Sequence, residues 1–226
     1  MNESIKKILS PRSIFFWLGG IIMCGLGISL CTKAAFGLSM IAAGPYIISE
    51  FVKNFLPWFS QGTAEYFWEA VILIVTCFVV KKFRWSYLLS FAVAVICGFV
   101  IDSWLFVFSS FTPSALWVRI VMLVLGSIAC SFGVACYFRT EMPLQVYELT
   151  VVEISKKYGF DKSKVKLVFD VTMLVCCVIM TLIFNHSLKG IGIGTVYITC
   201  VNAPLIKLHT KYLDKLESSI GKKKSK

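Results

Sequence analysis

Lys33 and Arg139 are the two cations in this sequence best placed to bind a ligand. Each follows an apolar stretch long enough to cross a membrane and precedes a helix-breaking residue and a short predicted helix. A helix N-terminus carries unbonded N–H groups and positive partial charge, so a cation beside it makes an anion-binding arrangement. If the short helices fold back into the membrane, both cations face one cavity and hold a solute there. The alternative is that both are interfacial cations extending to lipid headgroups.

Two acids near the start of other apolar stretches are the next candidates for substrate binding. They are Glu69 and Asp170. Carboxylates within membrane helices are costly and tend to be functional or paired. If these two point inward, pairing with Lys33 and Arg139 makes a neutral site that responds to a substrate or a proton. The alternative is that each interacts with the positive end of its own helix.

Asp102 and Asn202 lie near the ends of two further apolar stretches and are candidate polar contacts for a solute, or solvated helix ends. No catalytic or zinc-binding motif accompanies any of these residues. The only histidines, His186 and His209, are predicted on opposite sides of the membrane, and the nine cysteines lie almost entirely within apolar stretches. We therefore predict no catalytic residues, no metal, no cofactor and no enzyme activity.

The elements that position these residues are predicted to be membrane helices. Hydrophobic residues make up 58% of the 226 positions, charged residues 15%, and the mean hydropathy is +0.80. In a bilayer the backbone must satisfy its own hydrogen bonds, so long apolar runs form helices. The predicted spans are 14–32, 66–80, 86–108, 116–137, 165–184 and 188–206. Two short segments, 36–55 and 142–158, are predicted as re-entrant or interfacial helices.

The net charge of +11 comes from clusters beside the apolar stretches, at the N-terminus, near 81–84, near 156–166 and in the tail. Such clusters are typical of cytoplasmic loops next to anionic lipid, and not of nucleic-acid binding. If the short helices do not cross, every basic loop falls inside and both termini are cytoplasmic. The expected partners are the lipid bilayer and a small-molecule solute, with no nucleic acid. Self-association into a homo-oligomer is left open.

The two halves of the chain resemble each other at a constant spacing. Four residues of the first half recur 106 positions later, as Gly20, Gly27, Lys33 and Gly37 against Gly126, Gly133, Arg139 and Pro143. Three spans per half give the second copy the opposite orientation, as in many secondary transporters. We therefore expect an all-α membrane protein of two inverted three-helix repeats. The first is 1–110, the second 111–210, and a basic cytoplasmic tail is 211–226.

Two glycine-rich motifs resemble those of the YczE/YyaS/YitT group of bacterial integral membrane proteins. They are Gly25–Leu30 with Lys33–Ser39, and Gly190–Thr195 with Asn202–Ile206. The resemblance implies a multi-pass protein of the bacterial inner membrane. The inverted repeats and mirrored charges favour a transporter for a small polar or anionic solute. The alternative is a non-transporting accessory or regulatory protein that acts through a protein partner.

Overall fold

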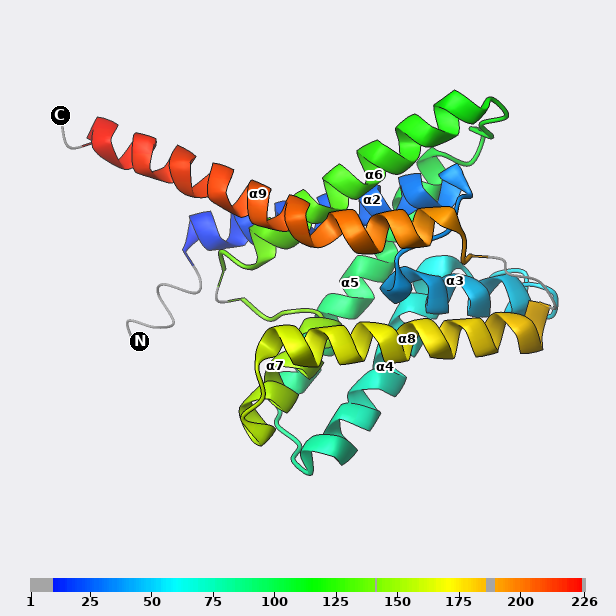
Figure 1. Cartoon of the computed structure of the whole chain (residues 1–226), viewed down its shortest axis with the longest axis horizontal. Coiled ribbons are helices and arrows are strands. Elements are labelled where there is room, and N and C mark those ends of the chain that lie inside the picture. The colour runs from blue at the N-terminus through cyan, green and yellow to red at the C-terminus, as the bar shows by residue number, and fades with distance from the viewer. Residues whose placement is uncertain (1–9, 141, 186–189, 225–226) are drawn as a thin grey trace.

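Figure 1 shows the fold, a computed structural model that describes residues 10–140, 142–185 and 190–224. Over these residues the chain forms helices and turns, with no strand, as the apolar runs predict. The helices are α2 (Pro11–Ala34), α3 (Met40–Val52), α4 (Gln61–Val80), α5 (Ser86–Val107), α6 (Leu116–Tyr137), α7 (Val146–Tyr158), α8 (Lys162–Asn185) and α9 (Ile193–Lys224).

Five of the described helices are long and apolar enough to cross a membrane. They are α2, α4, α5, α6 and the 164–184 part of α8. They correspond to five of the six predicted spans, and the short helices α3 and α7 occupy the two predicted short segments. The sixth predicted span coincides with the first half of α9, which lacks an apolar window of that length. The window that begins at Ile193 includes Asn202, Lys207 and His209, which lower its hydropathy.

Serine side chains fix where three of the helices begin. Ser10 accepts the N–H of Ser13 before α2, and Pro11 takes the first helical position. Ser39 caps α3 and Ser60 caps α4 in the same way. A hydroxyl at the N-cap satisfies an N–H group that the helix cannot bond, and proline has no N–H to satisfy there. These caps place the short helix α3 between two long membrane helices.

The helices α2 and α6 pack against each other through glycine. A Cβ added to Gly20 would lie 2.9 Å from the Gly133 carbonyl oxygen, and one added to Gly27 would lie 2.6 Å from the Gly126 carbonyl oxygen. Rising residue numbers in one helix therefore meet falling numbers in the other, so the two helices run antiparallel. Close backbone approach through small residues is the usual way membrane helices associate.

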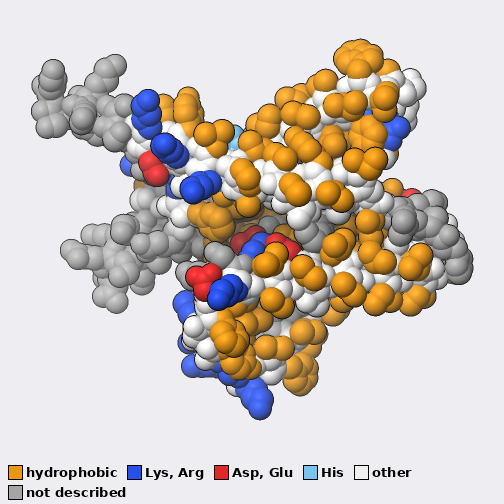
Figure 2. Space-filling model, in the orientation of Figure 1, with side chains coloured by type: hydrophobic (Ala, Val, Ile, Leu, Met, Phe, Trp, Pro, Cys, Tyr) orange, Lys and Arg blue, Asp and Glu red, His pale blue; other side chains and the backbone are white. Residues whose placement is uncertain are grey.

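The remaining helices pack in a related manner in the two halves. α5 packs on α2 as α9 packs on α6, and α3 of the first half packs on α8 while α7 of the second half packs on α4 (Figure 1). The outer surface in Figure 2 is largely apolar, as lipid contact requires. In the same view, acidic and basic side chains gather in a hollow between α9 and α8.

The two glycine motifs of the sequence meet in the fold. The Leu38 N–H donates to the Gly190 carbonyl at 2.9 Å, and the Gly194 N–H donates to the Phe36 carbonyl at 2.8 Å. A Cβ added to Gly192 would lie 2.5 Å from the same Phe36 oxygen. The turn before α3 and the start of α9 are therefore joined by backbone contacts that leave no room for a side chain.

Tyr87 at the start of α5 is expected to stabilise the attachment of α7. Its hydroxyl, buried, donates to Glu153 Oε2 at 2.7 Å, and Arg84 lies 3.5 Å from the other carboxylate oxygen. Tyr87→Phe should lower the free energy of unfolding by about 1–3 kcal/mol, because the variant leaves a buried carboxyl oxygen of Glu153 without its donor. Thermal unfolding in detergent measures it. Tyr158→Phe, which removes an exposed bond to Val79, should cost less, and an equal loss would contradict this account.

Candidate functional site

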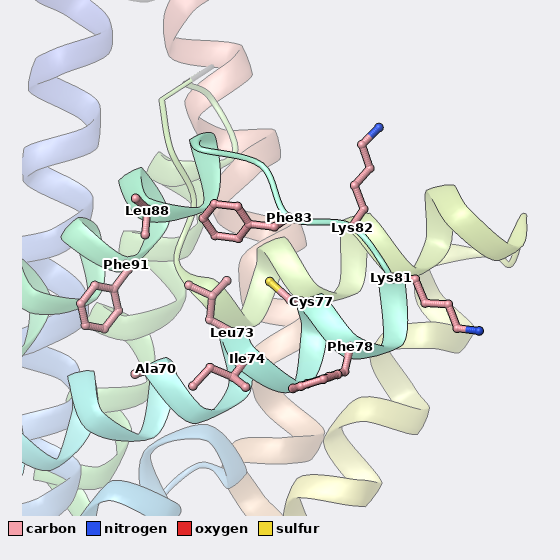
Figure 3. A pocket seen from close by; sticks show the side chains of 10 residues that line it. All are labelled: Ala70, Leu73, Ile74, Cys77, Phe78, Lys81, Lys82, Phe83, Leu88 and Phe91. Carbon is pink, nitrogen blue, oxygen red and sulfur yellow. The ribbon is translucent and has the colours of Figure 1, made fainter.

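Two pockets of the described structure are lined mostly by apolar side chains. One of about 510 Å³ lies between α4 and α5 and is lined by side chains such as Leu73, Phe78 and Phe91, with Lys81 and Lys82 at its end (Figure 3). Another of about 700 Å³ lies between α4, α7 and α8. Both suit hydrocarbon better than a charged solute. Buried polar side chains outside these two pockets are therefore the other candidates for a polar site.

The structure does not bring Lys33 and Arg139 together. Lys33 Nζ lies 3.4 Å from the Ser109 carbonyl oxygen, and the Arg139 guanidinium forms an ion pair with Asp214 of α9. Lys33 lies in the last turn of α2, Arg139 lies just after the end of α6, and α2 and α6 run antiparallel. The two cations therefore lie at opposite ends of the helix pair. The shared anion cavity that the sequence suggested is not formed.

The two predicted acid–cation pairs are also absent, because each acid has another partner. Asp170 pairs with Lys166 one turn away on α8, at 2.9 Å. Glu69 accepts the backbone N–H of Val146, at 3.0 Å, and so takes up the first N–H group of α7. The helix whose N-terminus Glu69 stabilises is thus α7 and not its own.

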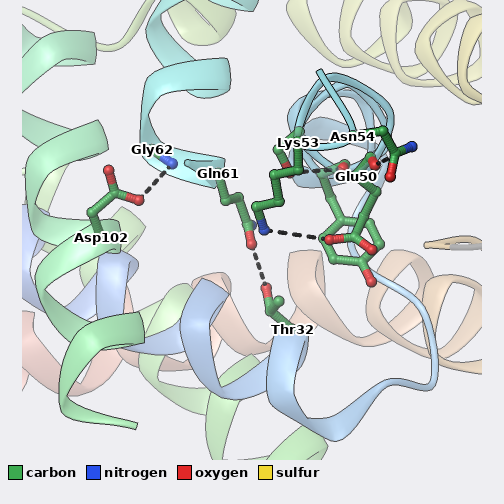
Figure 4. Close-up of polar contacts among 9 residues, drawn as sticks. Thr32, Glu50, Lys53, Asn54, Gln61, Gly62 and Asp102 are labelled. Carbon is green, nitrogen blue, oxygen red and sulfur yellow. Dashed lines mark hydrogen bonds and ion pairs between the residues drawn. The ribbon is translucent and has the colours of Figure 1, made fainter. Parts of the chain in front are cut away.

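Asp102 stabilises the start of α4 from the neighbouring helix α5. Its carboxylate accepts the Gly62 N–H at 2.8 Å and the hydroxyl of Ser60 (Figure 4). Gly62 allows this approach, because an added Cβ would lie 2.7 Å from Asp102 Oδ2. A carboxylate at a helix N-terminus satisfies free N–H groups and the positive partial charge there. Asp102 therefore has a structural role.

Replacing Asp102 is expected to destabilise the α4–α5 pair in a graded way. Asp102→Ala removes both hydrogen bonds and should lower the free energy of unfolding by about 1–2 kcal/mol. Asp102→Asn keeps a carbonyl oxygen for Gly62 and should lose less. Thermal unfolding in detergent ranks the two variants. Equal stability of Asp102→Ala and the unchanged protein would contradict the capping role.

Asn202 is half-buried on α9, and its Oδ1 atom has no hydrogen-bond partner among the described residues. It is the counterpart of Asp102 in the second half. Unlike α4 and α5, the helices α8 and α9 make little direct contact, so Asn202 does not reach the start of α8. Among the described residues, no group of polar side chains forms a candidate ligand site around Asn202.

A buried polar face on α4 is the most unusual feature of the described structure. Gln61, Glu65 and Glu69 follow each other at intervals of four, which places them on one side of the helix. Their exposed fractions are 3%, 1% and 0%. With a rise of 1.5 Å per residue, Glu69 lies about 12 Å from the start of α4, well inside the span. Buried carboxylates of this kind are costly and mark functional sites in membranes.

These side chains are held by groups from both halves of the chain. The Tyr147 hydroxyl of α7 donates to Glu65 Oε1 at 3.3 Å, next to the bond between Val146 and Glu69. Thr32 of α2 donates to Gln61 Oε1 at 3.2 Å (Figure 4). The first turn of α7 therefore covers the carboxylates of α4.

Each of the three α4 side chains retains an unused hydrogen-bonding atom. Glu65 Oε2, Glu69 Oε1 and Gln61 Nε2 are buried and have no partner among the described residues. Buried polar groups are nearly always satisfied, and an unsatisfied one calls for an explanation. We call Gln61, Glu65, Glu69 and Tyr147 the carboxylate site.

Other ionisable groups lie close to the carboxylate site. Glu148 of α7 acts on both α4 carboxylates through its charge, and Lys166 of α8 acts on Glu148 in turn. Burial raises the pKa of the Glu148 carboxyl, and Lys166 opposes that rise. Cys97 of α5 and Tyr137 of α6, 3.5 Å apart, complete the surroundings. No group of three metal-ligating side chains occurs among the residues that the structure describes.

Sequence reasoning selected Glu69 but missed Glu65 and Gln61. The span predicted from the sequence begins at 66, because residues 61–65 resemble an outer loop. This prediction places Gln61 and Glu65 outside the membrane. The structure extends the helix back to Gln61. The spacing of four between Gln61, Glu65 and Glu69 is the signal that would have found the face.

Comparisons with known proteins agree with the membrane fold. Residues 11–211 match a family described as a family of unknown function, DUF6198. The chain is 25% identical over 194 residues to a protein of Bacillus subtilis (strain 168) described as uncharacterized protein YyaS, covering 83% of this chain and 87% of that protein. No solved structure matches. The resemblance to the YyaS group is thus confirmed, and the chain is a multi-pass membrane protein that belongs to the DUF6198 family.

Proposed function

We propose that this protein is a small membrane transporter in which two inverted repeats move a small polar solute past the carboxylate site. In this proposal the first half of α9 is the sixth crossing, and both termini are cytoplasmic, as the loop charges predict. The proposal rests on the relation between the two halves and on the position of the buried carboxylates.

The contact between α2 and α6 supports the inverted repeats. Gly20 meets Gly133 and Gly27 meets Gly126, although the sequence relates Gly20 to Gly126 and Gly27 to Gly133. An axis of two-fold pseudosymmetry produces such crossed pairs, in which each residue meets the counterpart of the other.

The position of that axis can be located from the cysteines. Cys24 and Cys130 are themselves 106 positions apart, and Cys24 Sγ lies 3.6 Å from the Cys130 carbonyl oxygen. A residue that meets its own counterpart lies on the axis. Because α5 packs on α2 as α9 packs on α6, we assign the first half of α9 the role of a third span in the second half. These relations support six crossings.

The observation that carries the proposal is that both halves build the carboxylate site. Glu65 and Glu69 come from the first half, and Val146 and Tyr147 come from the second. In transporters with inverted repeats, the solute binds between the repeats near the middle of the membrane. A movement of α7 away from α4 would break two hydrogen bonds and open the site. The enclosed arrangement corresponds to the occluded step of an alternating cycle.

The charge of the site favours a solute that donates hydrogen bonds. The prediction of an anionic solute depended on Lys33 and Arg139 at one cavity, and they lie at opposite ends of the α2–α6 pair. The unused oxygens of Glu65 and Glu69 are acceptors. A polar or positively charged solute satisfies them.

Two cysteine variants test alternating access without knowledge of the solute. Gln61 and Thr76 are both buried on the inward side of α4, 3% and 1% exposed, on either side of the carboxylates. Gln61→Cys and Thr76→Cys would each be treated with a membrane-impermeant maleimide from either side of sealed vesicles. We expect them to react from opposite sides, and a change of pH should shift the two rates in opposite directions once each is normalised to the rate of a free thiol at the same pH. The unchanged protein gives the background from its own nine cysteines.

No reaction at either position from either side would contradict transport. It would favour the alternative of an accessory protein with a static core. Reaction of both positions from one side, with equal response to pH, would point to an open vestibule and would also contradict alternating access.

A further inference from the structure

We propose that the carboxylate site binds an organic cation that carries N–H donors, a guanidinium or primary ammonium group, and releases protons in exchange. This deepens the proposed function by naming the chemical class of the solute, and it rests on that function for its biological meaning. Binding itself can be measured independently of transport.

The unused hydrogen-bonding atoms of the site indicate which groups a ligand must present to it. Glu65 Oε2 and Glu69 Oε1 are acceptors from side chains one helical turn apart. Positions i and i+4 on a helix have Cβ atoms about 5–6 Å apart, so one small cation can reach both carboxylates. A guanidinium group presents several N–H donors in a plane and matches carboxylates especially well. Gln61 Nε2, also buried and unused, can donate to an acceptor elsewhere on the same solute.

Charge balance explains why Glu65 and Glu69 should release protons when a cation binds. Among the described residues, no lysine or arginine forms an ion pair with Glu65 or Glu69, since Lys166 pairs with Asp170 instead. Burying two ionised carboxylates side by side without a cation is prohibitively costly, so they carry protons before a cation binds. An incoming cation supplies the missing charge, and each carboxylate that ionises gives its proton to the solvent. The reaction is an exchange of one cation for one or two protons, with no covalent step.

The neighbouring groups neither replace the cation nor compete for it. Tyr147 contributes a neutral hydroxyl that already donates to Glu65. Glu148 on the same helix adds a further acid, which favours a cation. Cys97 and Tyr137, from α5 and α6, contact each other. Glu148 is therefore the additional acid at the site, and the cation that acts on it, Lys166 of α8, forms an ion pair with Asp170.

Calorimetric titration of the purified full-length protein in detergent tests the inference, with guanidinium chloride at millimolar concentrations as the probe. Repeating it in buffers of different ionisation enthalpy counts the protons released. We expect saturable binding with release of at least one proton. Glu65→Gln and Glu69→Gln should each weaken binding at least tenfold and reduce the proton count. Glu50→Gln is the matched control, because Glu50 is a partly exposed residue that pairs only with Lys53 in the described contacts.

Tetramethylammonium chloride is the second probe, since it has the same charge and no N–H group. It should bind at least tenfold more weakly than guanidinium. Equal binding of both probes, guanidinium binding unchanged in both glutamine variants, or no binding by the folded unchanged protein would overturn the inference. Opposite-sided labelling at positions 61 and 76 with no guanidinium binding would leave transport standing. Guanidinium binding without labelling would leave the site standing and contradict transport.

Discussion

Gly27→Ala is expected to destabilise the protein by about 1–3 kcal/mol, although alanine is the better helix former. A Cβ at Gly27 would lie 2.6 Å from the Cys130 backbone nitrogen and 2.6 Å from the Gly126 carbonyl oxygen. Both neighbours are backbone atoms and cannot rotate away. The clash therefore forces α2 and α6 apart along the contact that joins the two halves. Thermal unfolding in detergent measures the loss.

Gly19→Ala is the matched control, because Gly19 lies in the same helix with nothing within 4 Å of an added Cβ. It should leave stability unchanged or raise it slightly. Gly133→Ala, the counterpart of Gly27 in the second half, should cost about as much as Gly27→Ala, since its Cβ would lie 2.7 Å from the Gly20 carbonyl oxygen. Equal unfolding midpoints for Gly27→Ala and Gly19→Ala would contradict the packing of the two halves.

Glu65→Gln is expected to abolish proton-coupled transport while leaving the protein as stable as before or more so. The amide keeps an oxygen for Tyr147 and removes a buried carboxyl that lies one turn from a second one. An uncompensated buried acid costs stability and is retained for function. We expect a rise in the free energy of unfolding of up to about 1 kcal/mol. Thermal unfolding and flux measurements on the same preparation test both parts.

Glu69→Gln should lose transport to the same extent but behave differently in stability. Glu69 accepts the first N–H of α7, where Gln145 provides no side-chain cap. The amide keeps an oxygen for this N–H but cannot take the negative charge that the positive end of α7 favours, so a loss of about 0.5–1 kcal/mol is expected. If Glu65→Gln destabilised the protein strongly and left flux unchanged, the carboxylate would be structural and not part of a binding site.

The helix positions could be predicted from the sequence because a helix needs about twenty apolar residues to cross the hydrocarbon core of the bilayer. Five predicted spans and both short helices are found close to their expected places. The sixth predicted span lies in α9, where polar residues such as Asn202 interrupt the apolar run. The spacing of 106 between glycines also pointed to the pair of helices that pack at the centre, because close backbone approach restricts residue type.

The site was harder to predict because it depends on which distant elements meet. Charge alone suggested that Lys33 and Arg139 would share a cavity, but antiparallel packing of α2 and α6 separates them. The partner of Arg139 is Asp214, in a part of the chain treated as a basic tail. Nothing local to Glu69 indicates that it accepts a hydrogen bond from Val146, 77 positions away. Such contacts depend on the tertiary structure and cannot be predicted from the hydropathy pattern of the sequence.

Proton movement in sealed liposomes tests the central claim most directly. Liposomes containing the protein and an internal pH-sensitive dye would receive an inward gradient of guanidinium, with the membrane potential clamped. The account predicts that the lumen becomes more alkaline in step with guanidinium entry, because entering cations are exchanged for outgoing protons. Glu65→Gln and Glu69→Gln should abolish the change, and Glu50→Gln should preserve it. A lumen pH in the unchanged protein identical to that of empty liposomes would contradict the account.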